Sequence, residues 1–220
     1  MKASKQLLIV GAGGAGHEAL MVARRSQSET WEVVGFADDA FKSGGQVIEG
    51  IAVLGGVAEV LAQFRGRSLS FHCAIGNNAV RQKLAEAAET AGLVPATLID
   101  PTAVVADSAR IGPGTYVAPQ AFVGPQSSIG RHALINTLTS IGHHAVVGDY
   151  AQVCPGGKIS GYCRLGTGAF VGSNGVLAPK VNVGDWARIG AASLAARDVP
   201  AGTTLVGVPG KIIAVPASGT

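Results

Sequence analysis

The chain has 220 residues, of which 47% are hydrophobic, 14% are charged and 32 are glycine. The formal net charge is +3 and the lysines and arginines form no run, which excludes the basic patch that nucleic-acid binding requires. No apolar stretch has membrane length and the N-terminus lacks a signal-peptide pattern, so we expect a cytoplasmic protein without a membrane span.

The first hundred residues alternate between expected strands and helices. The expected strands are 7–10, 32–37, 51–54, 69–75 and 93–99, and the expected helices are 17–25, 56–64 and 80–92. Such alternation is typical of a parallel sheet covered by helices. We therefore predict an α/β domain over residues 1–99, a small parallel sheet that corresponds to half of a Rossmann-like fold.

A glycine-rich turn follows the first expected strand and leads into the first helix. Gly11, Gly13 and Gly16 match the pattern G-x-G-x-x-G, whose glycines let the backbone approach an anion at a helix N-terminus. Asp38 lies 22 residues past Gly16, near the place of the ribose-binding acid of dinucleotide folds. The domain is short for a complete dinucleotide fold. We predict nucleotide or nucleotide-sugar binding, with NAD binding and a purely structural turn as alternatives.

Other polar residues lie where further expected strands end. Asp38 and Asp39 follow the second strand, and Gly76, Asn77 and Asn78 follow the fourth. Ligands bind at the carboxyl edge of open parallel sheets, so these residues are candidates for sugar or base contacts. Ordinary strand-end turns are the alternative for both segments.

From residue 105 onward, an aliphatic residue recurs every six positions. The series is Val105, Ile111, Val117, Val123, Ile129, Ile135, Ile141, Val147, Val153, Ile159, Leu165, Val171, Leu177, Val183 and Ile189. Neither a helix nor an ordinary strand has this period, whereas a prism-shaped coil of three short strands does. We predict a parallel β-helix of roughly five coils over residues 100–212. We expect the repeats to fade after Ile189, residues 198–213 to leave the solenoid and close its end, and 213–220 to form a frayed tail.

Three cysteines, Cys73, Cys154 and Cys163, form no C-x-x-C motif and cannot all pair. We expect them to be reduced thiols of a cytosolic protein.

Two adjacent histidines, His143 and His144, fall on a corner of the predicted prism, where side chains point outward. One coil of about 18 residues places Pro125 and Gly161 beside His143. We expect Gly161 to leave an open slot beside the imidazole, through which a long thin ligand passes. A neutral imidazole is a suitable base near neutral pH, and an inert surface histidine is the alternative.

A zinc site is also conceivable from His132, His143 and His144. Adjacent histidines on a corner are expected to diverge, and no cysteine or carboxylate lies at ligand spacing. We therefore predict no metal.

Five segments together resemble a known family. The hexapeptides with TSIGHHAVVGDY and the closing GVPGK resemble the left-handed β-helix acyltransferases. The segments VGAGGAGHEAL, FADD and AIGNN resemble a narrower group among them. That group comprises the sialic-acid O-acetyltransferase-like enzymes and the bacterial N-acetyltransferases of nucleotide-linked 4-amino-4,6-dideoxysugars.

The resemblance implies a homotrimer with acetyl-CoA in the groove between neighbouring β-helices and the nucleotide sugar on the α/β domain. It implies that His143 is the general base and that the N–H of His144 or Gly161 stabilises the oxyanion. The positions that match sugar-nucleotide contacts are Gly13, Gly14, Asp38, Asp39 and Gly76. We expect a UDP-linked rather than a GDP-linked sugar.

The cofactor contacts expected on the β-helix are Gln152, Gly161, Ser173, Ala191 and Lys211. Cations for the CoA phosphates are expected among Lys180, Arg188, Arg197 and Lys211.

The chain departs from the family pattern in several places. His144 replaces the usual Asp or Glu after the base, and Gly142 replaces a residue that is often acidic. Gln152 replaces a histidine found in some members near the cofactor thiol. Ala15 replaces a histidine of the glycine-rich turn, and His17 lies further on.

Three other functions remain open from the sequence. One is O-acetylation of a sialic-acid-like sugar, the second is a non-catalytic nucleotide-binding trimer, and the third is an NAD-dependent enzyme with a solenoid for assembly. The co-occurrence of His143 and Gly161 disfavours the non-catalytic trimer, and the sequence has no recognisable hydride-transfer constellation for an NAD-dependent enzyme.

Overall fold

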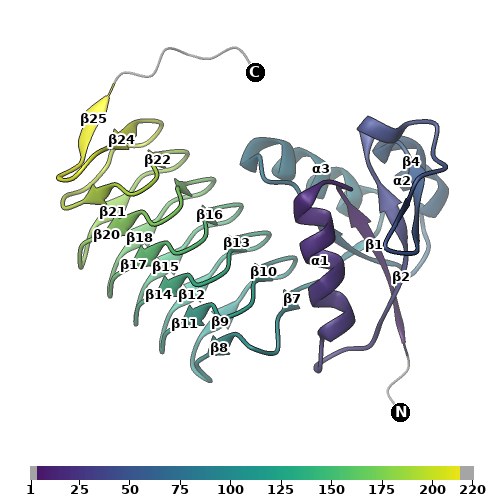
Figure 1. Ribbon diagram of the computed structural model, residues 1–220, viewed down its shortest axis with the longest axis horizontal. Helices are drawn as coiled ribbons and strands as arrows, with labels where there is room; N and C mark the ends of the chain where they lie inside the picture. The colour runs from purple at the N-terminus through teal and green to yellow at the C-terminus, as the bar shows by residue number, and fades with distance from the viewer. Residues whose placement is uncertain (1–3, 214–220) are drawn as a thin grey trace. The chain divides into compact units, whose positions relative to one another are not determined.

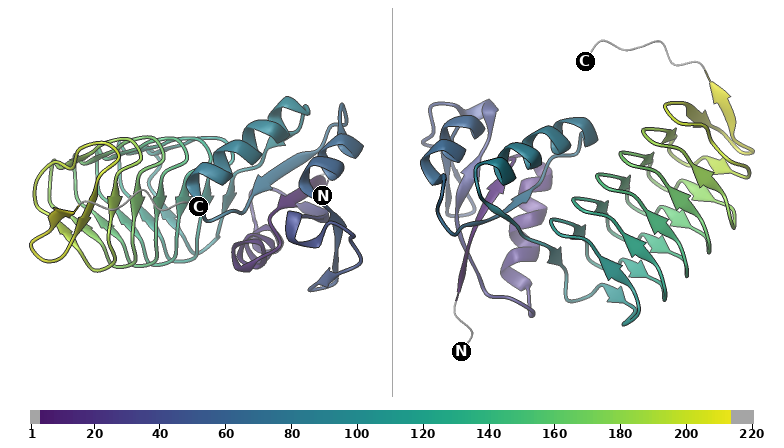
Figure 2. Two further views of the ribbon diagram at one scale, coloured as in Figure 1. Left: turned by 90° about the horizontal axis from the view of Figure 1, so that it is seen from above. Right: turned by 180° about the vertical axis from the view of Figure 1, so that it is seen from behind.

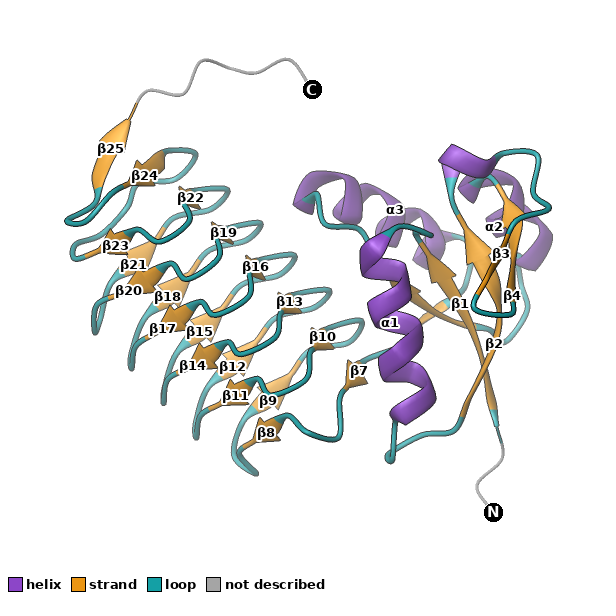
Figure 3. Cartoon of the chain, in the orientation of Figure 1, coloured by secondary structure: helices purple, strands orange, loops and turns teal. Residues whose placement is uncertain are grey.

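The computed structural model describes residues 4–213, which form two compact units. The first unit ends at Pro101 and the second begins at Thr102. Within the described residues, helices occur only in the first unit, and the second consists of short strands joined by turns (Figures 1 and 3). None of the helices in residues 4–213 has the length and apolar character that crossing a membrane requires.

The first unit is built on a six-stranded sheet with the order β3-β4-β2-β1-β5-β6. Its strands are β1 (Lys5–Val10), β2 (Trp31–Ala37), β3 (Val47–Ile48), β4 (Ile51–Gly55), β5 (Ser70–Cys73) and β6 (Val94–Pro95). The helices are α1 (Gly14–Arg25), α2 (Val57–Phe64) and α3 (Asn78–Thr90), with a short 3-10 helix η1 (Asp39–Phe41). Only β3 and β4 pair antiparallel in this sheet. The predicted α/β class is confirmed.

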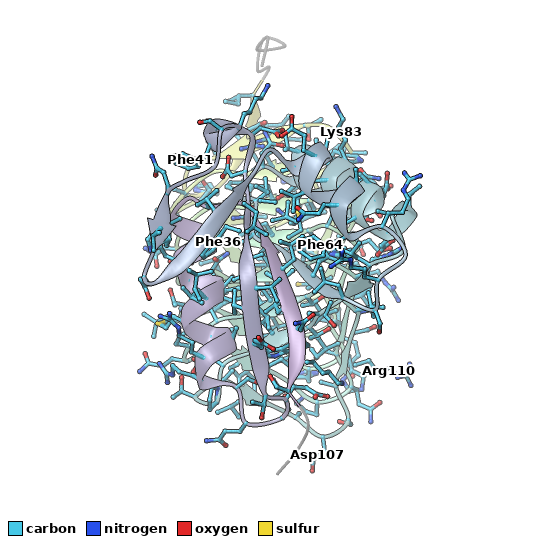
Figure 4. The ribbon with its side chains drawn as sticks, turned by 90° about the vertical axis from the view of Figure 1, so that its right-hand side faces the viewer. Phe36, Phe41, Phe64, Lys83, Asp107 and Arg110 are labelled. Carbon is cyan, nitrogen blue, oxygen red and sulfur yellow. The ribbon has the colours of Figure 1, made fainter. Side chains whose placement is uncertain are left out.

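Helices cover both faces of this sheet, with α1 on one side and α3 on the other (Figure 4). Because helices cover both faces, the last four residues of β1 are apolar. Leu7, Leu8, Ile9 and Val10 are all fully buried. Phe36 of β2 is fully buried too (Figure 4). The chain moves from β1 to β2 on one side and later adds β5 on the other. The carboxyl ends of β1 and β5 therefore flank the point where open α/β sheets bind ligands.

Two details of the first unit differ from the prediction. The strand expected at 93–99 is two short strands, β6 and β7 (Leu98–Ile99), and β6 ends at Pro95, which has no N–H for a ladder. The hairpin of β3 and β4 was not predicted. Its turn residues Glu49 and Gly50 have φ of 47° and 83°, the two positive values that a two-residue hairpin turn requires.

The second unit is a left-handed parallel β-helix, which confirms the predicted fold (Figure 2). Fifteen two-residue strands run from β8 to β22 without interruption. They are β8 (Val104–Val105), β9 (Arg110–Ile111), β10 (Tyr116–Val117), β11 (Phe122–Val123), β12 (Ser128–Ile129), β13 (Leu134–Ile135), β14 (Ser140–Ile141), β15 (Val146–Val147), β16 (Gln152–Val153), β17 (Lys158–Ile159), β18 (Arg164–Leu165), β19 (Phe170–Val171), β20 (Val176–Leu177), β21 (Asn182–Val183) and β22 (Arg188–Ile189).

Every third strand stacks in one sheet, so the prism has three faces and three corners. Ser140 pairs with Lys158 and Ile141 with Ile159, one coil of 18 residues apart. The second residue of nearly every strand is a buried aliphatic, and this inward row is the core of the unit.

Two corners bear on function, and both are columns of stacked turns. The His143 corner consists of the turns that join β11 to β12, β14 to β15, β17 to β18 and β20 to β21. The Ser173 corner consists of the turns that join β13 to β14, β16 to β17, β19 to β20 and β22 to β23.

The coils continue past Ile189, where the sequence predicted that they fade. β23 (Leu194–Ala195) stacks on β20, Val199 bridges to Val183, and β24 (Thr204–Val206) stacks on β22. The side chains of Ala195, Val199 and Leu205 are buried like those of the earlier coils. Val199 comes four positions after Ala195 rather than six, so a strict period misses it.

The last described strand, β25 (Lys211–Ile213), turns back and pairs antiparallel with β24. The prediction was that the chain leaves the parallel stack at residue 198. The structure shows that it leaves only after Val206. Ile213 belongs to β25, and the rest of the predicted tail, from residue 214, lies outside the described residues.

Candidate active site

His143 and His144 lie on the turn between β14 and β15, which belongs to the His143 corner. Both side chains are exposed. The backbone N–H of His144 donates to the carbonyl oxygen of Pro125 in the preceding coil, at 3.0 Å. In the following coil, the N–H of Tyr162 donates to the carbonyl oxygen of His143, also at 3.0 Å. The two histidines therefore lie between Pro125 and the Gly161–Tyr162 turn, as the coil spacing indicates.

The two imidazole rings converge, which corrects the expectation that they diverge. Nδ1 of His143 lies 3.1 Å from Nδ1 of His144, within hydrogen-bond distance. The ring centroids are 5.3 Å apart with an interplanar angle of 87°. The φ of His144 is 59°, in the left-handed region, as it is for the residues at the equivalent turn position of neighbouring coils, Gln126, Tyr162 and Lys180.

Tyr162 completes the cluster and was not predicted. Its ring stacks on His144 at a centroid distance of 4.6 Å and an interplanar angle of 19°. It also meets the ring of His143 edge-on, at 5.1 Å and 87°. Tyr162 follows His144 by one coil of 18 residues, so the repeat spacing itself contained the signal for this contact.

Gly161 does not leave the open slot that the sequence suggested. A Cβ at this position would lie 2.7 Å from both Cε1 and Nε2 of His143, so the space is filled by the imidazole. The absence of a side chain at Gly161 sets the position of the His143 ring. No room for a ligand is left between the ring and the glycine.

The backbone N–H groups of this corner differ in availability. The N–H of His144 is used by Pro125, whereas the N–H of Gly161 donates no hydrogen bond to any described residue. A Cβ at Gly142 would lie 2.6 Å from the nitrogen of Gly161. Because Gly142 has no Cβ, no side chain of that residue covers the Gly161 N–H.

The described residues contain no group of three or more histidine, cysteine or acidic side chains placed to hold a metal ion. His132 is fully buried and stacks on Tyr150, with a centroid distance of 5.5 Å. It therefore belongs to another part of the coil and does not join His143 and His144.

Three expected cofactor contacts lie at the Ser173 corner and its adjoining face. Gln152 is half-buried on β16, and its Nε2 donates to Sγ of Cys154 at 3.6 Å. Ser173 and Ala191 are exposed on successive turns of this corner. Within one chain, a face of the prism separates these residues from His143 and Gly161.

The expected phosphate-binding cations do not form one cluster. Lys180 is exposed at the His143 corner, and Arg188 lies over the ring of Phe170 at 4.4 Å. Arg197 and Lys211 line a cavity of about 240 Å³ near the last coil, together with Asp198. The pKa of Asp198 is lowered because its carboxylate accepts hydrogen bonds from the backbone and the side chain of Asn182.

The glycine-rich turn of the first unit combines two kinds of glycine. Gly11 has a φ of 104°, and a Cβ there would lie 2.6 Å from the carbonyl oxygen of Ala74. In contrast, a Cβ at Gly13 or Gly14 would meet nothing within 4 Å. Gly13 caps α1 without a side-chain hydrogen bond, so the first N–H groups of the helix are exposed to an anion.

Asp38 and Asp39 already accept hydrogen bonds from the backbone. Asp38 accepts from Ala12 N at 2.7 Å and from Ala40 N at 2.8 Å, which ties the glycine-rich turn to the end of β2. Asp39 Oδ1 accepts from Val57 N at 2.9 Å, at the start of α2. Both carboxylates therefore have a structural role in addition to any ligand contact.

The carboxyl edge of the sheet holds a cavity of about 140 Å³, with Gly11, Asp38 and Asp39 in its wall and apolar residues from α2 and α3. Gly76 is exposed at this edge, and a Cβ there would meet nothing within 4 Å. Asn77 caps α3 by accepting from Ala79 N and Val80 N, each at 3.1 Å.

The three cysteines are buried and form no disulfide. Burial raises the pKa of the Cys73 thiol to about 12, and burial also raises the pKa of Cys163. Cys73 and Cys163 are therefore poor nucleophiles.

Comparisons with known proteins identify the family of this chain. The family model of the PglD N-terminal domain matches residues 6–88. GDP-perosamine N-acetyltransferase of Escherichia coli O157:H7 is 29% identical over 211 residues, which cover 92% of this chain and 94% of that protein. A serine acetyltransferase of Synechococcus elongatus is 38% identical over 74 residues only, so the chain spans 30% of that relative's length.

A solved structure gives the decisive match. It is a histidine-to-asparagine variant of perosamine N-acetyltransferase from Caulobacter crescentus in complex with CoA and GDP-perosamine. It is 30% identical, has a TM-score of 0.88, and the match covers 95% of this chain and 97% of that one. The chain belongs to the hexapeptide-repeat family of acetyl-CoA-dependent sugar N-acetyltransferases. The resemblance and the enzyme class inferred from the sequence are thereby confirmed.

As a sugar N-acetyltransferase, the protein requires a base for the acceptor amine and a donor for the oxyanion. The His143 corner places an exposed imidazole next to the backbone N–H of Gly161, which donates to no described residue.

Proposed function

We propose that this protein transfers the acetyl group of acetyl-CoA to the amine of a nucleotide-linked 4-amino-4,6-dideoxysugar, a step in the synthesis of surface glycan precursors. The observation that carries the proposal is the full-length similarity to an enzyme solved with CoA and GDP-perosamine. Two relatives that are named for perosamine favour a GDP-linked substrate over the UDP-linked one that the sequence suggested. We therefore propose GDP as the nucleotide.

His143 is the general base of the proposed reaction. Its Nδ1 faces His144, so Nε2 is the nitrogen that remains to accept a proton. The neutral sugar amine attacks the thioester carbon, and its proton moves to Nε2. When the C–S bond breaks, the imidazolium returns that proton to the sulfur, and the products are the amide and CoA thiol.

Gly161 is the oxyanion donor in this proposal. The sequence left His144 and Gly161 as equal candidates. The hydrogen bond from His144 N to Pro125 and the uncovered Gly161 N–H favour Gly161. A backbone donor held by the coil is preorganised, which is the condition for strong stabilisation of a tetrahedral intermediate.

The nucleotide sugar binds at the carboxyl edge of the first unit. Gly13 and Gly14 offer exposed backbone at the N-terminus of α1, which suits a diphosphate. Asp38 and Asp39 stand in the wall of the neighbouring cavity, and Gly76 gives access to it. The domains proposed for these roles remain residues 1–99 for the nucleotide sugar and 100–212 for acetyl-CoA and catalysis.

A homotrimer with acetyl-CoA between neighbouring β-helices is part of the proposal. His143 and Gly161 lie at one corner of the prism, whereas Ser173 and Ala191 lie at another and Gln152 lies on the face beside it. A second copy brings the two corners together if adjacent prisms pack side by side. Exposed apolar side chains at Phe122, Leu138, Tyr162 and Trp186 are available for such packing.

The test is release of CoA thiol from acetyl-CoA with a panel of acceptors. The panel contains GDP-perosamine, UDP-linked 4-amino-4,6-dideoxysugars and free sialic acid, and the matched variant is His143→Asn. We expect turnover of the GDP-linked amine and a loss of about 100-fold or more in kcat for the variant. Turnover only with a hydroxyl acceptor would move the enzyme to O-acetylation. Nucleotide binding without turnover of any acceptor would refute acetyl transfer.

A further inference from the structure

When an imidazole accepts a proton on one nitrogen, a hydrogen-bond acceptor at the other nitrogen stabilises the imidazolium. No carboxylate among the described residues is hydrogen-bonded to His143. The group that the structure places there is Nδ1 of His144, at 3.1 Å. His144 in turn is stacked on Tyr162. We propose that His144 is a positioning residue that holds His143 in the tautomer with Nδ1 protonated and Nε2 free. This inference rests on the proposed role of His143 as the base.

The chemistry of the contact restricts the protons. A hydrogen bond between two Nδ1 atoms needs one N–H and one lone pair, so only one of the rings carries the proton between them. If His143 donates, its Nε2 has a lone pair and accepts the amine proton. If His144 donates, a neutral His143 is protonated on Nε2 and is blocked as a base.

Proton uptake decides the direction of this bond. After His143 accepts the amine proton, both of its nitrogens carry hydrogen, so His144 must be the acceptor. The bond is then charge-assisted, which strengthens it as the reaction proceeds. Such an interaction stabilises the state in which the proton has moved more than the resting enzyme, and it therefore acts on kcat.

The stack on Tyr162 gives His144 a fixed plane for this task. A ring held by a neighbour of the next coil keeps its Nδ1 directed at His143 and loses less rotational freedom when the bond forms. The other titratable side chains on this part of the coil are Tyr162 and the buried Cys163 on the turn after Gly161, Lys158 and Arg164 on the flanking strands, and Lys180 one coil further. The lysines and the arginine only donate, and Tyr162 meets both imidazoles through its ring. Among the described residues, the side-chain atom within hydrogen-bond distance of His143 Nδ1 is Nδ1 of His144.

Two substitutions of His144 separate hydrogen bonding from stacking. Asparagine places Oδ1 on Cγ, where His144 has Nδ1, and it tolerates the left-handed backbone of this turn. Phenylalanine keeps the stack on Tyr162 but has no acceptor. We expect His144→Phe to lower kcat by roughly 10–100-fold with little change in either KM. We expect His144→Asn to stay within about threefold of wild type, because the acceptor is retained.

A merely structural role for the stack predicts the opposite order, with Phe active and Asn impaired, and that result overturns the proposal. Melting temperatures of both variants control for folding. If His144→Phe does not fold, the Asn variant still decides, since a tenfold or larger loss of its kcat contradicts the acceptor role. The double variant His143→Asn/His144→Phe is expected to be no slower than His143→Asn alone, because both changes act through one base.

Nitrogen-15 NMR of histidine-labelled protein reads the tautomer without any substrate. We expect His143 to be protonated on Nδ1 in wild type and in His144→Asn, and to shift to the Nε2-protonated form in His144→Phe. An Nε2-protonated His143 in wild type overturns the proposal even if the enzyme is active. Activity that survives His143→Asn refutes the base assignment instead, so the two failures are distinguishable.

Discussion

Replacement of Gly161 by alanine tests whether the glycine sets the position of the base. The added Cβ would lie 2.7 Å from Cε1 and Nε2 of His143, whereas an ordinary contact begins at 3.4 Å. The imidazole must therefore move by at least about 0.7 Å, or rotate away from the turn. Gly161 has no positive φ, and the atoms in the way belong to an exposed side chain, so folding is not strained.

A displacement near 1 Å at the reacting group is enough to cost about 100-fold in rate. We expect Gly161→Ala to lower kcat by roughly 10–100-fold, measured by thiol release at saturating acetyl-CoA and acceptor, while the melting temperature stays within about 2 °C of wild type. Combined with His143→Asn, the alanine should add little further loss, because the smaller side chain no longer collides. Wild-type kcat in Gly161→Ala would refute the claim that this glycine positions the ring.

Three further predictions concern neighbouring parts of the chain. Tyr162→Phe should keep the stack on His144 and nearly all activity. Tyr162→Ala removes the stack that orients the His144 ring and should lower kcat by about tenfold. Equal kcat values for the two variants would contradict a role of the stack. The thiol of Cys73 has a pKa of about 12, so only about one part in ten thousand is thiolate at pH 8. Cys73 should therefore not react with a disulfide reagent until the protein is denatured. Rapid labelling of Cys73 in the native protein would show that it is accessible. Asn77→Ala should destabilise the protein by about 1 kcal/mol in denaturant titration, because α3 loses its N-cap, whereas Asn77→Ser should restore most of that loss.

The fold of the second unit could be predicted because one inward aliphatic residue per strand is a local requirement of every coil. The hexapeptide period encodes that requirement directly, and it also aligned His143 with Gly161. The six-residue spacing is broken near Val199, where the coil is shortened by two residues. The next buried residue then follows Ala195 after four positions instead of six.

The geometry of the candidate site was less accessible to sequence reasoning. Whether two neighbouring corner side chains diverge or converge depends on their side-chain rotamers, which the hexapeptide spacing does not give. The contact with Tyr162 depends on ring orientation across coils, which spacing alone does not give. The backbone hydrogen bonds of Asp38 and Asp39 likewise follow from loop geometry that the G-x-G-x-x-G pattern leaves open.

The reversal of the chain at β25 bears on the solubility of the solenoid. A stack of parallel strands ends in unpaired N–H and C=O groups, and such an edge is a template for the addition of another chain. Here β25 pairs with β24, and Gly207 and Gly210 exchange hydrogen bonds with Leu194 of β23. The final described residues thus cover the last parallel strands of two sheets. The edge strand of the larger sheet at this end is then β25, which is only three residues long and carries Lys211, and short charged edges disfavour the addition of another chain.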